Sequence, residues 1–424
     1  MENKISTLPR TSGWSFFVLA AAAILIALTY YNTFLGSQKL RTELNAVAFA
    51  DASHYVQLLD NGHYMDCFKE KPAGVHREHR RKSVHHIGYL FVASAIIQSA
   101  KATGLFDGGG AMWLVSPALG CINFLLAFWL FHAILPRKDF AWPGALMYAL
   151  VPGTWTYASM PESWVLSGTA VLFVLYARER QISRLMLGIL IGTFMLSNFL
   201  LLLLPALTYI RRESLKARVL DIVVVTLSAL ACWITLLLLL GLTLSPDFFP
   251  HRFFQLTVDF KNIFPENLKI YNPMRWLYNG TNLLVLPMIL NQGHLNFGRW
   301  ALMDTALKFP LGTLAVIGVA ALWAMAITRT AGLAMRTPQN TDAFFLGKIP
   351  GEWFYLLLVF AAAGMALYYE SFIYSSMVCP VFFTLTLRDL PRSDWTRKGL
   401  WVLTLLWALN AAQQMVTFRR GIGF

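Results

Sequence analysis

Residues 14–36 read WSFFVLAAAAILIALTYYNTFLG. The run holds no charged side chain, and a helix of this length, rising about 1.5 Å per residue, crosses the roughly 30 Å hydrocarbon core of a membrane. It is too long for the apolar core of a secretory signal peptide, and it has no small-residue cleavage site. The run therefore predicts a transmembrane helix that is retained as a signal anchor.

The composition extends this prediction to the whole chain. Of the 424 residues, 57% are hydrophobic and 13% are charged, whereas a soluble domain carries about 25% charged residues. Apolar runs near 20 residues long recur from end to end, and lipid cannot satisfy backbone N–H and C=O groups outside a helix. We predict an all-α polytopic membrane protein.

The net charge of +13 does not indicate a nucleic-acid-binding protein. The basic residues stand beside the ends of the apolar runs, where positive-inside orientation and anionic headgroups account for them. Membrane lipids are the expected partners of this charge, and no nucleic acid is expected.

The apolar runs predict about eleven transmembrane helices. Residues 183–210 are expected to form two short helices that break near Ser197 and Asn198, because this keeps the basic clusters at 178–184 and 211–218 on one side. The other spans are expected at 14–36, 111–134, 140–158, 162–178, 218–245, 309–328, 353–372, 373–388 and 399–418.

The run 84–104 decides the orientation of every later helix. If it lies along the membrane surface instead of spanning, the basic turns at 1–10, 137–138, 178–184, 211–218, 329–348 and 388–398 all become cytoplasmic. We therefore expect the external side to hold a long first loop, 37–110, with juxtamembrane helices, the turn 160–163, the loop 246–308 and the turn 370–376. This divides the chain into a membrane module (1–245), an external loop (246–308) and carboxy-terminal membrane helices (309–424).

Acidic residues gather in the first external loop. The chain has 22 of them, and five fall between positions 51 and 78: Asp51, Asp60, Asp66, Glu70 and Glu78. Histidine and lysine neighbours there would tune the carboxylate pKa values. Glu162 and Glu370 stand at helix ends on the same predicted side, where helix capping is the alternative explanation. The cluster predicts a reaction centre at the membrane surface.

Four segments on that side carry recognisable motifs. They are Asp51-Ala52-Ser53-His54-Tyr55 with Gly62-His63-Tyr64 after it, Glu70-Lys71-Pro72, the stretch 151–162, and the stretch from Tyr369 and Glu370 to Pro380. These segments resemble the GT-C superfamily of membrane glycosyltransferases, which use polyprenyl-phosphate-linked sugars, and in particular its aminoarabinose transferase and protein O-mannosyltransferase-like branch. Ala52 departs from the family's second acidic residue, and His54 from its usual Arg.

The resemblance implies a GT-C-like fold and a division of roles among these residues. Sugar transfer needs a carboxylate that takes a proton from the acceptor, and Asp51, with Glu162, is the candidate catalytic group. Cationic side chains would stabilise the leaving lipid phosphate. The expected substrate-binding residues are His54, Tyr55, Lys71, Arg77, Arg80, Arg81, His85, Tyr369 and Glu370. Glu70 and His294 are the implied ligands of a divalent metal ion.

The functional hypothesis is a glycosyltransferase that moves a sugar from a polyprenyl-phosphate donor to a lipid or glycan acceptor. It would act in cell envelope glycan biosynthesis, at the outward face of a bacterial inner membrane. A multi-pass transporter or lipid-linked sugar flippase is the alternative, although such proteins usually place ionisable residues near the bilayer midplane and contain repeats.

Overall fold

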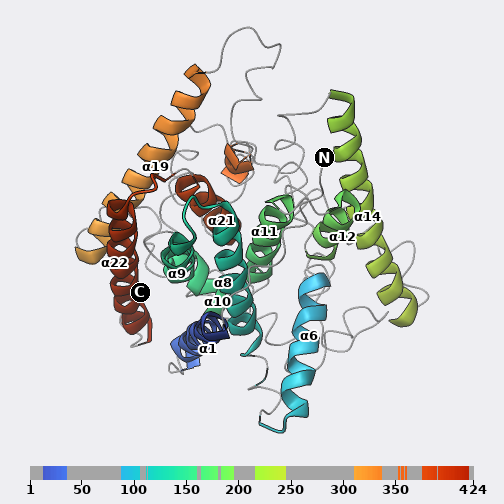
Figure 1. The fold of residues 1–424 in the computed structure, drawn as a ribbon. Coiled ribbons are helices and arrows are strands. Elements are labelled where there is room, and N and C mark those ends of the chain that lie inside the picture. Colours follow the sequence, from blue (N-terminus) through green and yellow to red (C-terminus); the bar gives the residue numbers. More distant parts are fainter. Residues whose placement is uncertain are drawn as a thin grey trace, which may run out of the picture.

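The computed structural model describes residues 13–35, 87–105, 111, 113–159, 164–179, 183–194, 215–244, 310–336, 352–353, 355–357, 359–360, 375–388 and 390–419. Within these ranges every regular element is a helix, as the sequence predicts. In chain order they are α1 (Gly13–Leu35), α6 (Ile87–Ala102), α8 (Val115–Ile134), the 3₁₀ turn η2 (Lys138–Phe140), α9 (Ala141–Leu150), α10 (Pro152–Ser159), α11 (Trp164–Glu179), α12 (Arg184–Phe194), α14 (Leu215–Leu244), α19 (Pro310–Arg336), α21 (Ser375–Leu387) and α22 (Asp394–Arg419) (Figure 1).

Among the residues that the structure describes, three helices are long and apolar enough to cross a membrane: Ser15–Thr33, Val115–Ile134 and Leu311–Gly332. They coincide with the spans expected at 14–36, 111–134 and 309–328, which supports a membrane association of the protein. The count of eleven spans stays a prediction, as does the division of the chain into 1–245, 246–308 and 309–424.

The expected single span at 140–158 is wrong in one respect, because the run forms two helices. Val151 adopts an extended backbone (φ −70°, ψ 141°) and separates α9 from α10. The reason is local: the ring of Pro152 disfavours the helical conformation in the residue before it, and Pro152 has no N–H to continue the helix. Pro152 instead starts α10, a favoured position for proline.

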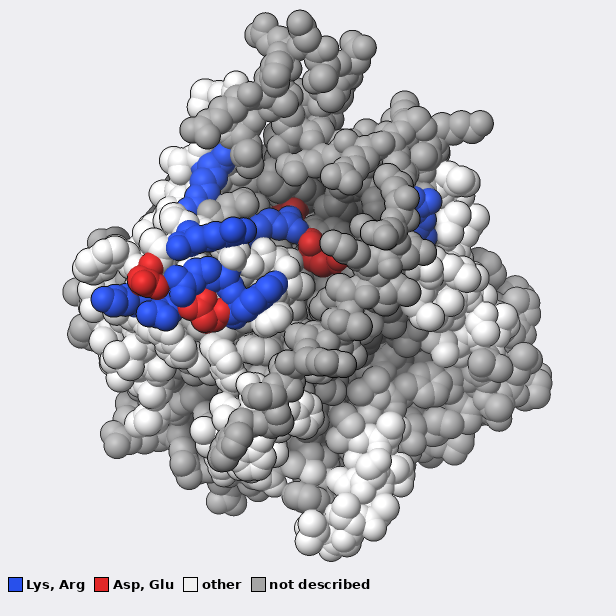
Figure 2. Space-filling view, viewed as in Figure 1, with Lys and Arg blue, Asp and Glu red and all other residues white. Residues whose placement is uncertain are grey.

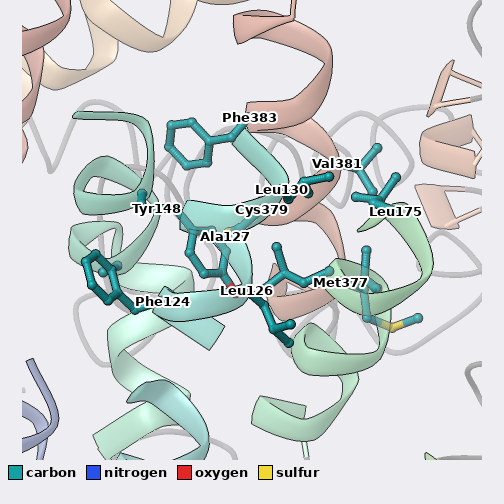
Figure 3. Packing of buried hydrophobic residues seen from close by; sticks show 14 of the residues in the cluster. Phe124, Leu126, Ala127, Leu130, Tyr148, Leu175, Met377, Cys379, Val381 and Phe383 are labelled. Atoms are coloured by element: carbon teal, nitrogen blue, oxygen red, sulfur yellow. The ribbon is translucent and has the colours of Figure 1, made fainter. Parts of the chain in front are cut away.

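Helix α8 lies at the centre of the bundle and contacts α1, α6, α9, α10, α11 and α21 (Figure 1). Its apolar side chains, with those of α9, α11 and α21, form a continuous buried core, part of which is drawn in Figure 3. In that core Tyr148 of α9 meets Phe383 of α21 edge to face, with ring centroids 6.4 Å apart. The core thus joins helices that are more than 200 residues apart in the sequence.

The bundle has two distinct ends. At the end we call the ion-pair end, Arg137 beyond α8 binds Asp394 at the start of α22 (Nη1–Oδ1 2.8 Å), and Arg388 beyond α21 binds Glu179 at the end of α11. The opposite end, which we call the loop end, holds the last turn of α1 and the first turns of α8, α11 and α21. Helices α8, α11 and α21 therefore run in the same direction through the core, opposite to α1.

Helix α6 has 16 residues, a length of about 24 Å. It packs beside α8 and α12 through a face that includes Tyr89, Ala93 and Ile97. Its length is below the roughly 30 Å of a hydrocarbon core. Its placement along the membrane surface stays a prediction.

Helices α12 and α14 run side by side in the same direction. Gly188 faces Val225 and Ser228, and one turn later Gly192 faces Ala229. Two glycines four residues apart let helix backbones approach closely, a packing mode typical of helices in lipid. Because the two helices are parallel, α14 begins at the same end as α12. The second of the two short helices expected at 183–210 lies outside the described residues and stays a prediction.

Gly192→Val is expected to separate α12 from α14. A Cβ atom at Gly192 would come within 2.9 Å of the carbonyl carbon of Ala229, which is backbone and cannot move aside like a flexible side chain. We expect a loss of about 1–3 kcal/mol in the free energy of unfolding, measured by denaturant titration of the purified protein in detergent. Gly399→Val is the control, since a Cβ there meets no atom within 4 Å; equal losses for the two variants would refute the close packing.

Candidate functional site

All the site residues expected from the sequence lie outside the described residues. These are the catalytic candidates Asp51 and Glu162, the substrate-binding candidates His54, Tyr55, Lys71, Arg77, Arg80, Arg81, His85, Tyr369 and Glu370, and the metal candidates Glu70 and His294. The structure instead describes the helix ends from which three of their segments start, and these ends lie together.

The helix ends beside the expected site meet at the loop end. Glu162 stands two residues before Trp164, the first residue of α11, and Glu370 stands five residues before Ser375, the first of α21. Asp51 is in the segment that follows α1. The starting points of these three segments are held together by direct contacts between α1, α8, α10, α11 and α21.

Tyr30 fixes the last turns of α1 against the break between α9 and α10. Its hydroxyl donates a hydrogen bond of 2.6 Å to the carbonyl oxygen of Ala149. That carbonyl lies in the last turn of α9, where the helix ends and leaves acceptors without intrahelical donors. Its ring also packs so closely on α8 that a Cβ at Gly120 would lie 2.7 Å from ring carbon Cε2. The end of α9 thus holds α1, the helix that precedes the Asp51 segment, in place.

A buried polar node lies just inside the loop end, formed by Asn123 of α8, Tyr148 of α9, Gly168 of α11 and Ser376 of α21. A Cβ placed on Gly168 would be 3.1 Å from the Ser376 carbonyl oxygen, 3.4 Å from Asn123 Nδ2 and 3.5 Å from the Tyr148 hydroxyl oxygen. Four helices therefore bring polar groups to one point. Figure 3 shows Tyr148 reaching from α9 into this part of the core.

The node also contains unused hydrogen-bonding capacity. Asn123 Nδ2 donates to the carbonyl oxygen of Val165 at 3.1 Å, which ties α8 to α11. Asn123 Oδ1 and Ser376 Oγ are buried and have no hydrogen-bond partner among the described residues. An unsatisfied buried polar atom costs about 1–3 kcal/mol. Neutral amide and hydroxyl groups of this kind can hold a hydroxyl group or a water molecule, but they supply no general base.

Buried threonines elsewhere in the core behave differently. Thr384 and Thr386 of α21 and Thr404 of α22 donate to carbonyl oxygens one turn back in their own helices, over distances of 2.8 Å. Such bonds satisfy the hydroxyl locally. Asn123 and Ser376 of the node therefore differ from these three threonines, whose hydroxyls are satisfied within their own helices.

The ion-pair end carries charge, and most of it is paired (Figure 2). Arg388 binds Glu179 and also Glu352, whose Oε1 lies 3.2 Å from Arg388 Nη1. The Glu352 side chain is only 2% exposed and that of Arg388 is 32% exposed. This three-residue cluster joins α11, α21 and the segment around residue 352.

A second network at this end joins η2 to the start of α22. Arg137 binds Asp139 (Nη2–Oδ2 2.7 Å) and Asp394, and Arg397 lies 3.7 Å from both carboxylates. The hydrogen bond from Arg137, followed by the charge of Arg397, lowers the pKa of Asp394 below its ordinary value. Because this pKa is lowered by folding, the pairing stabilises the fold above the ordinary pKa of about 4 and is lost as the pH falls through the folded value.

Metal-ligating side chains do not gather in the part of the chain that the structure describes. No group of three or more His, Cys, Asp or Glu side chains there is arranged to hold an ion. The expected pair Glu70 and His294 stays a prediction.

Sequence reasoning missed both the polar node and the Arg388 cluster. Asn123 was detectable as an amide inside the apolar run 111–134, and polar residues in such runs usually face the inside of a bundle. Gly168 and Ser376 carried no signal, because their role depends on which helices become neighbours.

No family model, no curated protein and no solved structure matches this chain.

Proposed function

We propose that the protein is an integral-membrane glycosyltransferase that moves a sugar from a polyprenyl-phosphate donor to a lipid or glycan acceptor. The proposal rests on the acidic and basic residues of the segment 51–86 and on their resemblance to GT-C enzymes. One structural observation supports it. The helix ends beside the segments that hold Asp51, Glu162 and Glu370 meet at the loop end, so these three segments begin close together.

The proposed chemistry breaks the bond between the anomeric carbon and the phosphate oxygen of the donor. Asp51 takes the proton of the acceptor hydroxyl as its oxygen forms the new bond to the anomeric carbon. The electron pair of the broken bond stays with the polyprenyl phosphate, and Lys71 with the arginines near it stabilises that charge. His54, Tyr55 and His85 would contact the substrates, and no step requires the proposed metal ion.

The proposed orientation places the loop end on the outer face of a bacterial inner membrane. Three observations fit it: the described residues of the basic turns at 137–138, 178–184 and 388–398 lie at the ion-pair end, as cytoplasmic turns should. The polyprenyl chain would then lie in the membrane with its sugar phosphate at the loop end, where the acceptor arrives.

A transporter or lipid-linked sugar flippase is the second candidate. The observation that favours it is the break between α9 and α10 beside the polar node, since broken helices form substrate sites in many transporters. Against it, Arg329 is the one Lys, Arg, Asp or Glu in the three described spans, and it lies in the last turn of its span. Transport coupled to ions or protons usually needs such groups near mid-membrane.

Lys71→Gln is expected to weaken binding of a polyprenyl-phosphate donor by about 10-fold or more, since a charge-assisted hydrogen bond to a phosphate contributes about 1.5–3 kcal/mol. Pro72 has a fixed φ and no N–H, so Lys71 is expected in a turn that presents its ammonium to the headgroup layer. The measurement is equilibrium binding of a fluorescent polyprenyl-phosphate sugar to the purified protein.

Lys82→Gln is the matched control for this prediction. It lies further along the same basic stretch, and the loss of an exposed charge changes binding by about 0–1 kcal/mol. Equal, small effects of the two substitutions would make Lys71 an ordinary interfacial lysine and remove its role in the proposal.

A further inference from the structure

The ion-pair end presents an excess of positive charge around the start of α22. Five cations (Arg137, Lys138, Arg392, Arg397 and Lys398) lie there with two carboxylates, Asp139 and Asp394. The two carboxylates are taken up by Arg137 and Arg397. Three positive charges are left over, and Figure 2 shows the band of Lys and Arg side chains on this face of the molecule.

The three remaining cations are exposed, and none of them forms an ion pair with a carboxylate in the described part of the chain. Lys138 Nζ donates to the carbonyl oxygen of His132, a bond that orients the ammonium but leaves its charge uncompensated. Arg392 stands in the turn before α22, and Lys398 lies in the second turn of that helix. The paired arginines hold η2 and the start of α22 together, so these cations occupy fixed neighbouring elements.

A tryptophan stands among these cations with its ring almost fully exposed. Trp395 is 81% exposed, and Lys398 Nζ lies 5.1 Å from the ring centroid. An indole ring in a charged surface turn gains nothing in water, but it is favoured at the boundary between lipid headgroups and acyl chains.

The face of α22 beyond Trp395 and Lys398 is apolar and exposed. Val402, Leu405 and Leu409 follow at helical spacing, with exposed fractions of 66%, 61% and 47%. A negatively charged headgroup at the cations would therefore place its acyl chains along this stripe. A soluble anion would use the cations alone, whereas a phospholipid would contact both the cations and the stripe.

We propose that this surface is a binding seat for an anionic phospholipid. The phosphate lies among Lys138, Arg392 and Lys398, Trp395 packs at the level of the glycerol, and the acyl chains lie along Val402, Leu405 and Leu409. The seat is at the end of the bundle opposite the loop end. Lipid binding at this seat is independent of the proposed glycosyltransferase activity, because it involves neither the sugar donor nor the acceptor.

The experiment titrates the full-length protein in detergent with short-chain phosphatidylglycerol and, in parallel, with phosphatidylcholine, and counts bound lipid by native mass spectrometry. Each of Lys138→Gln, Arg392→Gln and Lys398→Gln is expected to weaken phosphatidylglycerol binding about fivefold, and the triple variant about 100-fold, since one cation near an anionic surface contributes about 1 kcal/mol. Trp395→Ala is expected to weaken binding of both lipids, because the ring recognises the interface and not the charge.

Lys101→Gln is the matched control, since this exposed lysine is in the last turn of α6, away from the seat, and its loss should leave phosphatidylglycerol binding unchanged. Unaltered binding to the triple variant would overturn the proposal. So would displacement of the lipid by inorganic phosphate at equal concentration, since the seat would then recognise a soluble anion.

Discussion

Asp51→Asn is expected to lower sugar transfer at least about 100-fold, because a positioned general base contributes about 10²–10⁴-fold to a rate. The substitution keeps the volume of the side chain and its capacity to accept one hydrogen bond, but it removes the group that takes the acceptor proton. The measurement is the initial rate of transfer by the purified variant at saturating donor, with its unfolding transition recorded in the same detergent.

Asp66→Asn is the control for Asp51. It removes a carboxylate from the same first loop, one that has no role in the proposed chemistry. We expect transfer within about twofold of the unmodified protein, because Asp66 takes no proton in the proposed mechanism. A properly folded Asp51→Asn protein that transfers sugar at the normal rate would remove Asp51 from catalysis, and with it most of the proposed mechanism.

Arg388→Met is expected to have the largest effect on stability. Loss of one partner from a buried ion pair costs about 3–5 kcal/mol. Arg388 is 32% exposed, so solvent screening reduces the expected loss to about 2–4 kcal/mol. The physical cause is the Glu352 carboxylate, which is buried and would lose the guanidinium that compensates it. The free energy of unfolding is measured by reversible denaturant titration in detergent.

Two further variants, one at this cluster and one at the second ion-pair network, separate the effect of the buried charge from that of packing. Arg388→Met combined with Glu352→Gln should recover a large part of the lost stability, because the buried charge is then gone. Arg397→Gln should cost under about 1 kcal/mol, because that arginine is 43% exposed and lies 3.7 Å from its carboxylates. If the double variant were as unstable as Arg388→Met alone, charge compensation would not be the function of Arg388.

The long apolar runs predicted the helices well because their length alone carries the signal. The runs 14–36, 111–134 and 309–328 correspond to α1, α8 and α19 with boundaries within a few residues, except that α19 continues to Arg336. The start of α22 was expected at 399, but it begins at Asp394 after Ser393, whose hydroxyl accepts from the backbone N–H of Thr396 at 3.1 Å. This N-cap is a polar signal that an apolar run does not contain.

The break between α9 and α10 was detectable from the sequence, but the prediction of one uninterrupted span at 140–158 missed it. The pair Val151 and Pro152 stands in the middle of the run 140–158, where a proline inside a helical pattern ends or kinks the helix. The overall hydrophobicity of the run outweighed this local signal in the prediction.

The polar node depends on tertiary packing and could not be derived in the same way. Asn123 and Ser376 are more than 250 residues apart, and they meet only because α21 packs against α11 at the turn of Gly168. A pattern within one helix gives no information on that neighbour. The proposed roles of the catalytic residues come from the sequence alone, because the segments that hold them lie outside the described residues.

Sugar transfer by the protein is tested most directly in detergent micelles. A micelle has no two leaflets, so a flippase has nothing to transport across, whereas a transferase still acts. The donor is the polyprenyl-phosphate sugar that accumulates in the lipid extract of a strain lacking the protein, and the same extract fractions supply acceptors. We predict that the purified protein converts this donor to free polyprenyl phosphate with the sugar on an acceptor, both followed by mass spectrometry, and that Asp51→Asn does not. A donor left intact by the folded, unmodified protein with every acceptor fraction, or no accumulated donor in that strain, would contradict the glycosyltransferase account.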